Sequence, residues 1–351
     1  MRIDEWVSRR RTLLAFYYAV VKPILPTAIR YLLRKLMVRR ADASGSLLEW
    51  PSDDSLDRLQ RLLLQLILVA SGRKEMKFAW FWPDGRPWAA VLTHDVETAG
   101  GLANLPKVAE MERERGLRSS FNFVPRDYEI PGSVLRSLRE GGFEIGVHGY
   151  THDGALFSRW HTFLERVVTI NECARQWNAS GFRSPATYRN QEWFHLLGFE
   201  DDSSLSNTAP YEPQPGGCGS FFPFLADDLV ELPITLPQDH TLFGLLGQTD
   251  AQTWLTSLQR IKEANGMACV LTHPDPDAGY VGLTKNAAHY REVLDAVADS
   301  DAWVPLPRDL ARWWRRRTLT PSEQIGDIEG ISYGTAVLRS QGGVEIVPPA
   351  R

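Results

Sequence analysis

Short apolar segments alternate with helical segments through most of the chain, and this alternation limits the fold more than any other feature of the sequence. The segments with strand character are residues 89–97, 119–125, 143–148, 181–185, 229–233, 267–273 and 302–306. The helices predicted between them are residues 105–115, 132–140, 158–177, 191–197, 251–264 and 285–298. Strands that alternate with helices over a segment of this size favour a parallel β/α barrel over separate β-sandwiches.

Charged and imidazole side chains lie at the ends of several predicted strands. They are Asp95, Glu97, His148, Arg183 and His273. In parallel β/α barrels the chemistry takes place at the carboxyl ends of the strands. We therefore expect these side chains to meet in one site.

Residues 143–152 carry half of a metal-binding pattern. The apolar alternation of this stretch ends in the run His148-Gly149-Tyr150-Thr151-His152, which brings two imidazoles to one end of a strand. Catalytic zinc sites use three protein ligands and leave one position open, so a carboxylate or a third histidine must come from another segment. The alternative is that two of the eight histidines fall four residues apart by chance.

Three parts of the chain are predicted from the pattern. They are an N-terminal helical extension at residues 1–80, the barrel at residues 81–317 and a C-terminal tail at residues 318–351. Within the extension, residues 55–70 place leucine and isoleucine on one stripe, which predicts a helix. Within the tail, residues 335–347 contain Gly342-Gly343 between apolar stretches, which predicts a small β-hairpin.

The first 40 residues contain a basic amphipathic pattern. In residues 29–40 the apolar positions alternate with lysine and arginine, which is typical of a helix that lies on anionic membranes. The alternative is a helix packed on the barrel with its cations in solvent. The apolar run at residues 13–21 is too short to span a bilayer and ends without a small-residue cleavage site, so we expect neither a transmembrane anchor nor secretion.

Composition excludes some classes of protein. The net charge of −4 and the absence of a domain-wide basic pattern argue against nucleic acid as a partner. The three cysteines, Cys173, Cys218 and Cys269, are far apart and lack CxxC spacing, which argues against a disulfide framework. We therefore expect a cytoplasmic protein, which would be peripheral on the inner face of the membrane if residues 1–40 bind lipid.

Five ordered motifs between residues 89 and 275 resemble those of the polysaccharide deacetylase superfamily, carbohydrate esterase family 4. They are Leu92-Thr93-His94-Asp95-Val96-Glu97, His148-Gly149-Tyr150-Thr151-His152, Phe182-Arg183-Ser184-Pro185, Asp202-Ser203-Ser204 and Leu271-Thr272-His273-Pro274. The resemblance implies a distorted (β/α)7-type barrel that holds a divalent metal, commonly zinc. It also implies removal of acetyl groups from N-acetylated sugars, so that an N-acetylated glycan is the expected substrate.

The resemblance implies a role for each matching catalytic residue. Asp95 would be the base that takes a proton from water, and Arg183 would hold Asp95 by a bidentate contact. His273 would be the general acid that protonates the departing amine. Asp202 matches the position that supports this acid.

The metal ligands implied by the resemblance are His148, His152 and one carboxylate. Many family members have two adjacent aspartates in the first motif, whereas here the acid after Asp95 is Glu97, as in a branch with the pattern Asp-Val-Glu. Residues two apart in a strand face the same side, so Glu97 is predicted to be the third ligand. By the same rule His94 faces away from the site.

A further group of residues is predicted to contact the substrate. It comprises Pro185, Ala186, Tyr188 and Trp193. A backbone N–H near Ala186 would stabilise the oxyanion, and the aromatic rings would stack on a pyranose ring. The alternative for Trp193 is core packing, because the chain contains 12 tryptophans.

Three functions follow from these patterns. The first is a metal-dependent hydrolase that removes N-acetyl groups from an amino sugar in a polysaccharide or glycan precursor. The second is a catalytically silent glycan-binding or scaffold protein of envelope polysaccharide assembly. The third is an amidohydrolase that acts on a small cyclic amide.

Overall fold

The computed structural model of the chain describes residues 48–277, 279–282, 284–321 and 323–350. The predictions for residues 1–40, namely the basic amphipathic helix and its membrane contact, lie outside this part of the chain and stay predictions. In the described part, no helix has the length and apolar character needed to cross a bilayer.

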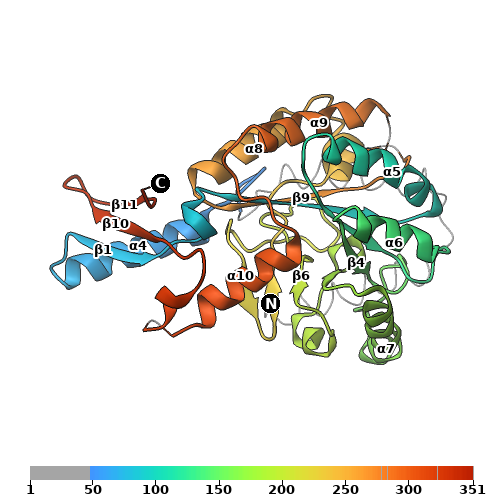
Figure 1. Ribbon diagram of the computed structural model, residues 1–351, viewed down its shortest axis with the longest axis horizontal. Coiled ribbons are helices and arrows are strands. Elements are labelled where there is room, and N and C mark those ends of the chain that lie inside the picture. The colour runs from blue at the N-terminus through green and yellow to red at the C-terminus, as the bar shows by residue number, and fades with distance from the viewer. Residues whose placement is uncertain (1–47, 278, 283, 322, 351) are drawn as a thin grey trace, which may run out of the picture.

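One sheet of eight strands forms the centre of the molecule (Figure 1). In spatial order its strands are β7 (Phe224–Ala226), β8 (Leu229–Glu231), β6 (Asp201–Asp202), β5 (Gly181–Arg183), β4 (Glu144–His148), β3 (Ser120–Phe123), β2 (Ala89–Val96) and β9 (Met267–Thr272). All neighbouring strands are parallel except β7 and β8. Seven strands therefore run in one direction, as the predicted (β/α)7-type barrel requires.

Hydrogen bonds join the two ends of the parallel sheet. The backbone N–H groups of Thr235 and Leu236, which follow β8, both donate to the carbonyl of Cys269 in β9 at 3.3 Å. The Thr235 hydroxyl accepts from the Cys269 N–H at 2.7 Å and donates to the Met267 carbonyl at 2.9 Å. These hydrogen bonds, made by the Thr235 side chain and two backbone amides, close the curled sheet between β8 and β9. The predicted distorted barrel is therefore confirmed.

Helices cover the outer face of the barrel (Figure 1). They are α5 (Ala99–Arg113), α6 (Gly132–Glu140), α7 (Trp160–Trp177), α8 (Gln252–Glu263), α9 (Thr284–Ala298) and α10 (Pro307–Leu319). Short helices occupy η2 (Pro83–Gly85), η3 (Pro185–Thr187), η4 (Gln191–Leu196), η5 (His240–Leu246) and η6 (Ile325–Asp327). Helix α5 begins earlier than predicted because the Thr98 side chain caps it by accepting from the N–H groups of Gly100 and Gly101.

One predicted strand is missing from the structure, and strands β1 (Glu75–Ala79), β6 and β7 and one helix were not predicted. Residues 302–306 make only an isolated bridge between Trp303 and Ala89, since prolines at 305 and 307 limit ladder hydrogen bonds. Strand β6 contains only two aspartates, so no apolar pattern marked it. Helix α10 was not predicted, although Pro307 at its first turn and a buried face with Leu310 and Trp314 are ordinary helix features.

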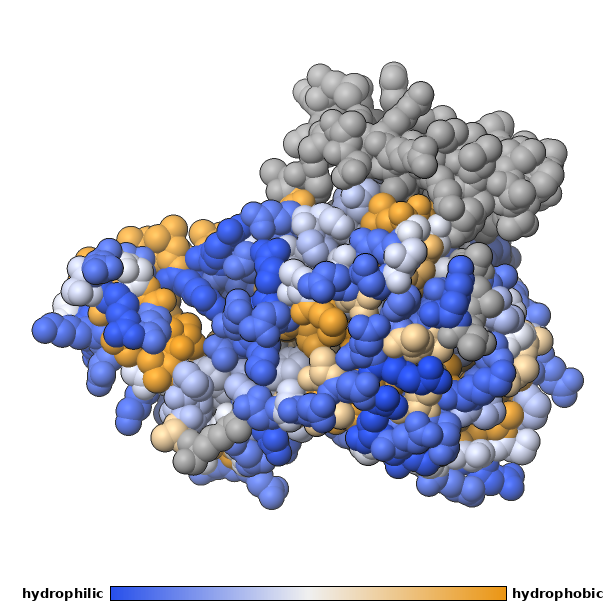
Figure 2. Space-filling model, turned by 90° about the horizontal axis from the view of Figure 1, so that it is seen from above, coloured by the Kyte–Doolittle hydropathy of each residue, from blue (hydrophilic) through white to orange (hydrophobic). Residues whose placement is uncertain are grey.

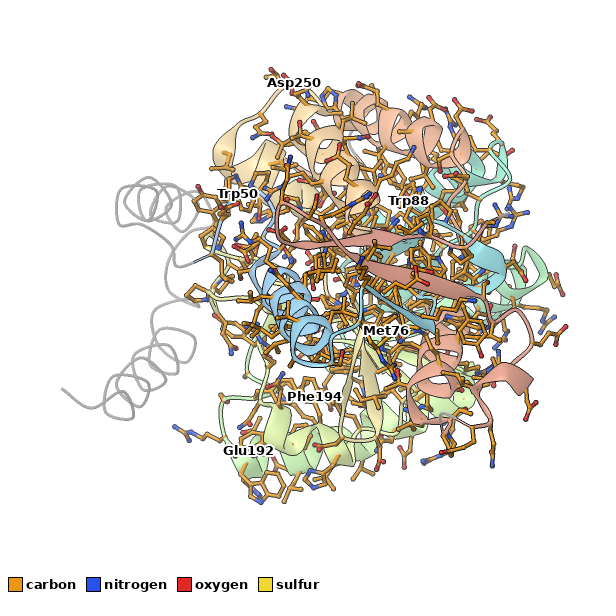
Figure 3. The ribbon with its side chains drawn as sticks, turned by 90° about the vertical axis from the view of Figure 1, so that its left-hand side faces the viewer. Trp50, Met76, Trp88, Glu192, Phe194 and Asp250 are labelled. Carbon is orange, nitrogen blue, oxygen red and sulfur yellow. The ribbon has the colours of Figure 1, made fainter. Side chains whose placement is uncertain are left out.

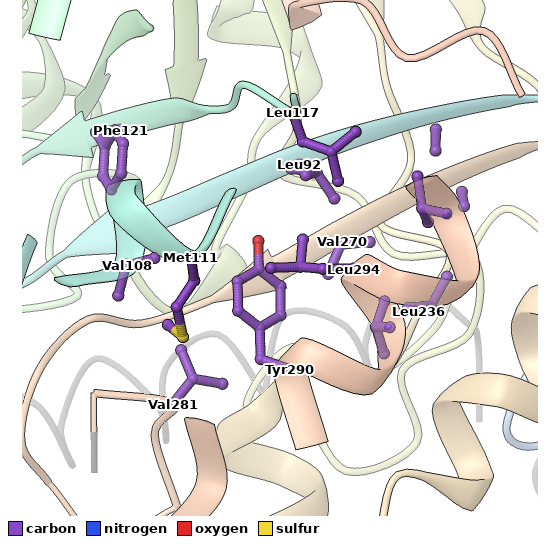
Figure 4. Close-up of a cluster of buried hydrophobic side chains, with 14 of the residues drawn as sticks. Leu92, Val108, Met111, Leu117, Phe121, Leu236, Val270, Val281, Tyr290 and Leu294 are labelled. Atoms are coloured by element: carbon purple, nitrogen blue, oxygen red, sulfur yellow. The ribbon is translucent and has the colours of Figure 1, made fainter. Parts of the chain in front are cut away.

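The main core lies between the sheet and helices α5, α6, α8 and α9. Figure 4 shows part of it, where the ring of Tyr290 from α9 lies among Leu92, Met111, Val270 and Leu294. All five side chains are at most 7% exposed. Burying a side chain of this size contributes about 1.5–3 kcal/mol, so this core fixes the strand ends that carry the site.

A small lobe projects from the barrel and contains the C-terminal end of the described chain (Figure 1). It consists of α4 (Ser55–Ala70) and an antiparallel sheet in the order β1 (Glu75–Ala79), β10 (Tyr333–Leu338), β11 (Val344–Val347). Helix α4 contacts β10 and β11, and Figure 3 views the lobe from its free side. The predicted helix at residues 55–70 and the predicted hairpin at residues 335–347 are both present.

Candidate active site

The strand register brings the predicted site residues to one edge of the sheet. Asp95 in β2 lies opposite Asn122 in β3, and His148 in β4 lies opposite Arg183 in β5. His273 directly follows β9. The carboxyl ends of these parallel strands therefore deliver an acid, an imidazole, a guanidinium and a second imidazole to the same place.

Three side chains could hold a metal ion together. One ligand atom each from Glu97, His148 and His152 lies within 4.8 Å of the other two, and among the described residues these form the only such group. The Glu97 Oε1 and His152 Nε2 atoms are 2.9 Å apart. This is the ligand set predicted from the sequence.

The His148 ring is oriented for metal binding. Its Nδ1 lies 3.0 Å from the Arg183 carbonyl, so Nδ1 carries the proton and Nε2 holds a free lone pair. The Nε2 atom is buried and has no hydrogen-bond partner within the described part of the chain. Burial lowers the pKa of His148 to about 4, which keeps the ring neutral near pH 7.

Gly149 lets the chain turn directly after His148. Its φ is +67°, and a Cβ atom there would lie 2.5 Å from the Pro185 ring. Any other residue would meet both a conformational cost and this clash. Pro185, which was predicted as a substrate contact, therefore has a packing role beside the His148 motif.

These ligands fit a divalent metal. Two imidazoles and one carboxylate suit zinc and similar metals, and three protein ligands leave positions open. A ligating histidine usually donates its other ring N–H to a backbone carbonyl, as His148 does to Arg183. The orphaned Nε2 atom of His148 is the feature that a bound cation would explain.

Asp95 is held in place by two donors. The Asn122 side chain donates to Asp95 Oδ1 at 2.9 Å, and Arg183 Nη1 contacts the same oxygen at 3.2 Å. The other oxygen, Oδ2, lies 3.7 Å from His148 Nε2. Burial raises the pKa of Asp95, but interactions with the His148 ring, Arg183 and His273 outweigh burial and hold it below the ordinary value. Asp95 is therefore an ionised carboxylate with one oxygen directed toward the ligand group.

The predicted bidentate contact between Arg183 and Asp95 is wrong. Only one guanidinium nitrogen reaches Asp95, and it also donates to the Thr93 hydroxyl at 2.8 Å. The remaining donors go to the backbone carbonyl and the hydroxyl of Ser203, each at 2.7 Å. Arg183 is almost fully buried, so it needs partners on several strands to satisfy its donors.

Glu97 is fixed by the loop after β9. The Asp275 carboxylate accepts from the Glu97 backbone N–H at 3.0 Å, and the Tyr280 hydroxyl donates to Glu97 Oε2 at 3.0 Å. The charges of His152 and His273 overcome burial and place the pKa of Glu97 well below its ordinary range. The carboxylate is therefore ionised and oriented before any ligand arrives.

His273 pairs with Asp239, which the sequence patterns did not identify. The His273 Nδ1 and Asp239 Oδ1 atoms are 2.7 Å apart, and Asp239 Oδ2 accepts from the His273 backbone N–H at 2.9 Å. The opposite ring nitrogen, Nε2, lies 3.6 Å from Glu97 Oε1. Burial lowers the pKa of His273, but Asp239 and then Glu97 outweigh it and raise the pKa to about 10.

The prediction that Asp202 supports His273 is wrong. Asp202 contacts Ser204, whose hydroxyl donates at 2.7 Å, and it shares a hydrogen bond with Glu231 on the neighbouring strand. Two carboxyl groups can share such a bond only when one is protonated, and burial raises the pKa of both. Asp202 is part of a buried acid pair between β6 and β8.

The predicted substrate contacts either lie in a strained loop or pack against other side chains. Ala186 and Thr187 have φ of +55° and +54°, so the loop after β5 is held in a strained conformation next to Arg183. Trp193 instead packs against Phe157 and Phe163, which favours the alternative of core packing. Tyr188, at 9% exposed, is buried.

His94 faces away from the site, as predicted. Its Nε2 lies 2.6 Å from Glu112 Oε1 in α5, and its Nδ1 lies 2.7 Å from the Thr272 hydroxyl. The ring is fully buried and also contacts Tyr290 in α9. The period-two rule thus separates Asp95 and Glu97 on one side of β2 from His94 on the other.

Residues that the motifs missed complete the site. Asn122 interrupts the apolar pair Phe121 and Phe123, and its alternation could have placed it on the same side as Asp95. Asp239 precedes η5 and caps it, which is an ordinary position for aspartate and gives no hint of His273. Tyr280 lies in a polar loop without a pattern.

Comparison with known proteins identifies the fold. No protein-family model matches the sequence, and no curated protein matches it. A solved structure described as a polysaccharide deacetylase from Mycobacterium smegmatis is similar over 69% of this chain and 95% of its own, with 22% identity and a TM-score of 0.57. Another, from Pseudomonas aeruginosa PAO1 and also described as a polysaccharide deacetylase, is similar over 68% of this chain and 95% of its own, with 14% identity and a TM-score of 0.55.

A structure of PuuE allantoinase is similar to a comparable degree. It covers 67% of this chain and 92% of its own length, with 13% identity and a TM-score of 0.54. The barrel therefore shares its fold with these solved structures, which agrees with the distorted β/α barrel expected from the five motifs. This fold supports several chemistries, so the activity must be argued from the site itself.

Proposed function

We propose that this chain is a metal-dependent hydrolase that removes N-acetyl groups from an amino sugar in a polysaccharide or glycan precursor. One observation carries the proposal: a carboxylate and an imidazole outside the group of Glu97, His148 and His152 both lie close to it. Asp95 is 3.7 Å from His148, and His273 is 3.6 Å from Glu97.

Amide hydrolysis makes three demands that this arrangement could meet. The reaction needs an activated water, a stabilised oxyanion and a proton for the departing amine. A divalent metal held by Glu97, His148 and His152 would supply Lewis acidity, which makes water a usable nucleophile near neutral pH. Zinc is the proposed metal because the donors are two imidazoles and a carboxylate.

Asp95 and His273 take opposite roles in proton transfer. Asp95 is ionised and can accept a proton from water, while Asn122 and Arg183 keep its carboxylate aimed. His273 is protonated near neutral pH because of Asp239, so it can donate a proton from Nε2 to the leaving nitrogen. Two titratable groups whose surroundings push their pKa values apart are a common acid and base pair.

The loop after β5 is the proposed oxyanion site. Positive φ values at Ala186 and Thr187 are costly, at about 1–3 kcal/mol each, and such strain concentrates at functional sites. A backbone N–H of this loop would then face the carbonyl oxygen of the substrate. Because Pro185 packs on Gly149, the loop is positioned relative to His148.

Hydrolysis of a small cyclic amide is the second candidate. PuuE allantoinase shares the fold of the barrel, and the same acid, base and ligand groups would serve ring opening. The third reading, a catalytically silent glycan-binding protein, is disfavoured because the ligand group, base and acid are all present.

Acetate release is the direct test. Purified protein would be incubated with oligomers of N-acetylglucosamine and, in parallel, with allantoin, and its metal content would be measured on the same sample. Acetate release that is lost with a chelator and restored by zinc supports the proposal. Ring opening of allantoin without acetate release would favour the second candidate over the first. Bound metal with neither reaction would favour a catalytically silent protein.

The Asp95→Asn variant is the matched control for this test. It keeps the shape of the side chain and its contacts with Asn122 and Arg183 but removes the base. Acetate release by this variant at the wild-type rate would show that the activity belongs to a contaminant or to another site.

A further inference from the structure

Helix α4 in the small lobe packs with a mixed side toward the protein. Leu68 is fully buried, and Asp57, at 4% exposed, accepts hydrogen bonds from the Ser220 hydroxyl at 2.6 Å and from the Phe221 N–H at 2.8 Å. Arg61 reaches the Ala264 carbonyl. A surface helix ordinarily buries its apolar side and exposes its polar side, whereas α4 buries polar groups and leaves most of its apolar residues exposed.

The outward side of α4 is apolar along the whole helix. Seven of its side chains are between 39% and 58% exposed, and together they define the apolar face of α4: Leu56, Leu59, Leu62, Leu63, Leu66, Ile67 and Val69. With 3.6 residues per turn these positions fall in one arc about 160° wide, interrupted only by Ser55 in the first turn. Figure 2 shows hydrophobic side chains gathered on the lobe that contains α4.

This face is larger than ordinary surface apolarity explains. Seven half-exposed side chains of this size present an area on the order of several hundred Å², which is the range of the largest patch on a typical monomer. Single exposed leucines are common, but a continuous arc of them marks an interaction surface. The polar contacts of Asp57 fix the orientation of the helix, so the apolar face cannot simply rotate inward.

Cations outnumber acids in the segment that contains α4. Arg73 and Lys74 follow the end of the helix, and Lys77 lies on β1; all three are exposed, with the acid Glu75 among them. From residue 55 to residue 79 the chain holds five Lys and Arg, including Arg58 and Arg61 on α4 itself, against two acids, Asp57 and Glu75. The described segment that carries the apolar face therefore has a net charge of +3, in a chain whose total is −4.

We propose that the apolar face of α4 docks on an anionic lipid bilayer. The helix would lie in the plane of the interface, with its leucines among the acyl chains and the neighbouring cations among the headgroups. If a second copy of this chain packed on the face, the cations of the two copies would lie close together and repel each other. Residues 1–40 would also bring cations to this border if they covered the face, since they hold ten Lys and Arg against two Asp and Glu. Only an anionic partner complements both the apolar arc and its positive border.

This proposal does not depend on the hydrolase activity. It also differs from the prediction that residues 1–40 contact a membrane, because it assigns a described, folded surface to the contact. The two contacts would act side by side, and variants of α4 separate them.

Sedimentation with vesicles tests the proposal on the full-length protein. The vesicles would be phosphatidylcholine alone or phosphatidylcholine with about 30% phosphatidylserine. The test variant is Leu59→Gln/Leu63→Gln/Leu66→Gln, and the matched control is Leu164→Gln/Val168→Gln on the outer side of α7, whose residues are similarly exposed. Because these side chains are exposed, both variants should melt as the wild type does.

The expected result is binding of the wild type and the α7 variant to anionic vesicles, weakened by salt, with the apparent affinity of the α4 variant lower by about tenfold or more. Equal binding of the α4 variant, or no binding of the wild type, would overturn the proposal. So would a concentration-dependent dimer of the wild type that the α4 variant abolishes, because the face would then be an interface between copies.

A single-site probe covers the case in which the triple variant folds poorly. Leu66→Cys would be labelled with a polarity-sensitive fluorophore, beside Val168→Cys on α7 treated in the same way. A blue shift at position 66 alone, and only after anionic vesicles are added, supports the proposal. A blue-shifted emission at position 66 before vesicles are added would show that another protein segment already covers the face.

Discussion

His273 and Asp239 form a buried pair in which Nδ1 of the ring lies 2.7 Å from Oδ1 of the carboxylate. The same carboxylate accepts from the backbone N–H groups of His273 and Val281, at 2.9 and 3.0 Å. Asp239 therefore fixes the tautomer and direction of the ring and stabilises its charged form. This relationship keeps His273 protonated near neutral pH, as the proposed role of general acid requires.

The Asp239→Asn variant should lose activity through His273. We expect kcat to fall by about 10²–10⁴-fold, the usual range for losing a positioned acid. Asp239 raises the pKa of His273 to about 10, so wild-type His273 stays protonated until the pH approaches that value. Without the carboxylate, His273 loses its proton at lower pH, so the basic limb of the pH–rate profile should move to lower pH. The pH–rate profile and metal content, measured together, check this prediction.

Asp202→Asn is the matched control for Asp239→Asn. Asp202 contacts Ser204 and Glu231, so its replacement should leave the basic limb where it is in the wild type. A shift of the limb in the Asp202 variant but not in the Asp239 variant would restore the role predicted from the motifs.

The Asp95→Asn variant should separate catalysis from metal binding. Asparagine keeps an oxygen for Asn122 and Arg183 but cannot accept the proton from water. We expect turnover to fall by about 10²-fold or more while bound metal stays close to one per chain. Because Asp95 Oδ2 is 3.7 Å from His148 Nε2, loss of metal together with activity would identify Asp95 as a ligand instead.

Local periodicity predicted the parts of the site that lie on one strand. The two-residue repeat of β2 placed Asp95 and Glu97 together and His94 opposite, and the structure agrees. Motif order predicted the strand ends that bring His148, Arg183 and His273 together. These features depend on neighbours in sequence or on a repeated architecture, which a pattern records.

Contacts that depend on long loops were not predicted. Asp202 ends β6 and Asp239 lies in the segment after β8, and only the path of the chain decides which one reaches His273. The pattern of α4 predicted a helix but not which side it buries, because Asp57 faces inward only when Ser220 and Phe221 are there to donate. In both cases tertiary structure chose between locally equivalent positions.

A buried acid away from the site gives a stability prediction. Glu144 in β4 is 1% exposed and accepts from the Ser180 hydroxyl at 3.2 Å and the Arg308 N–H at 3.1 Å. Burial raises its pKa from 4.5 to about 7. The folded state therefore holds a proton that the unfolded state releases above pH 4.5, so stability falls as pH rises from there through 7.

Glu144→Gln should remove this loss of stability at high pH. The pKa difference sets an upper limit of about 3 kcal/mol, so the melting temperature of the variant should exceed that of the wild type by about 4 °C at pH 8 and by little at pH 5. Glu200→Gln is the control, because Arg312 lowers the pKa of Glu200, and its replacement should not stabilise the protein at pH 8. A Glu144→Gln effect that is the same at both pH values would contradict the prediction.

The Glu97 carboxylate, which directly follows β2, decides whether the site works as proposed. Glu97 Oε1 is 2.9 Å from His152 Nε2, and Asp275 and Tyr280 hold Glu97 in this position. Glu97→Ala removes the only carboxylate of the ligand group and leaves a pair of imidazoles. We expect metal affinity, measured by competition with a chelator, to fall by about 100-fold or more, since even the partners that orient a ligand are worth about 10–100-fold.

His94→Ala should give the opposite pattern. His94 bridges Glu112 and Thr272 in the core, so its loss leaves buried polar groups unpaired and should cost about 1–3 kcal/mol of stability. Metal affinity should stay within a few-fold of the wild type, because the ring lies on the other side of β2 from Glu97. Melting curves on the same samples separate the two effects. If His94→Ala weakened metal binding more than Glu97→Ala did, then β2 would present its other side to the site, and Asp95 would lose its place as the base as well.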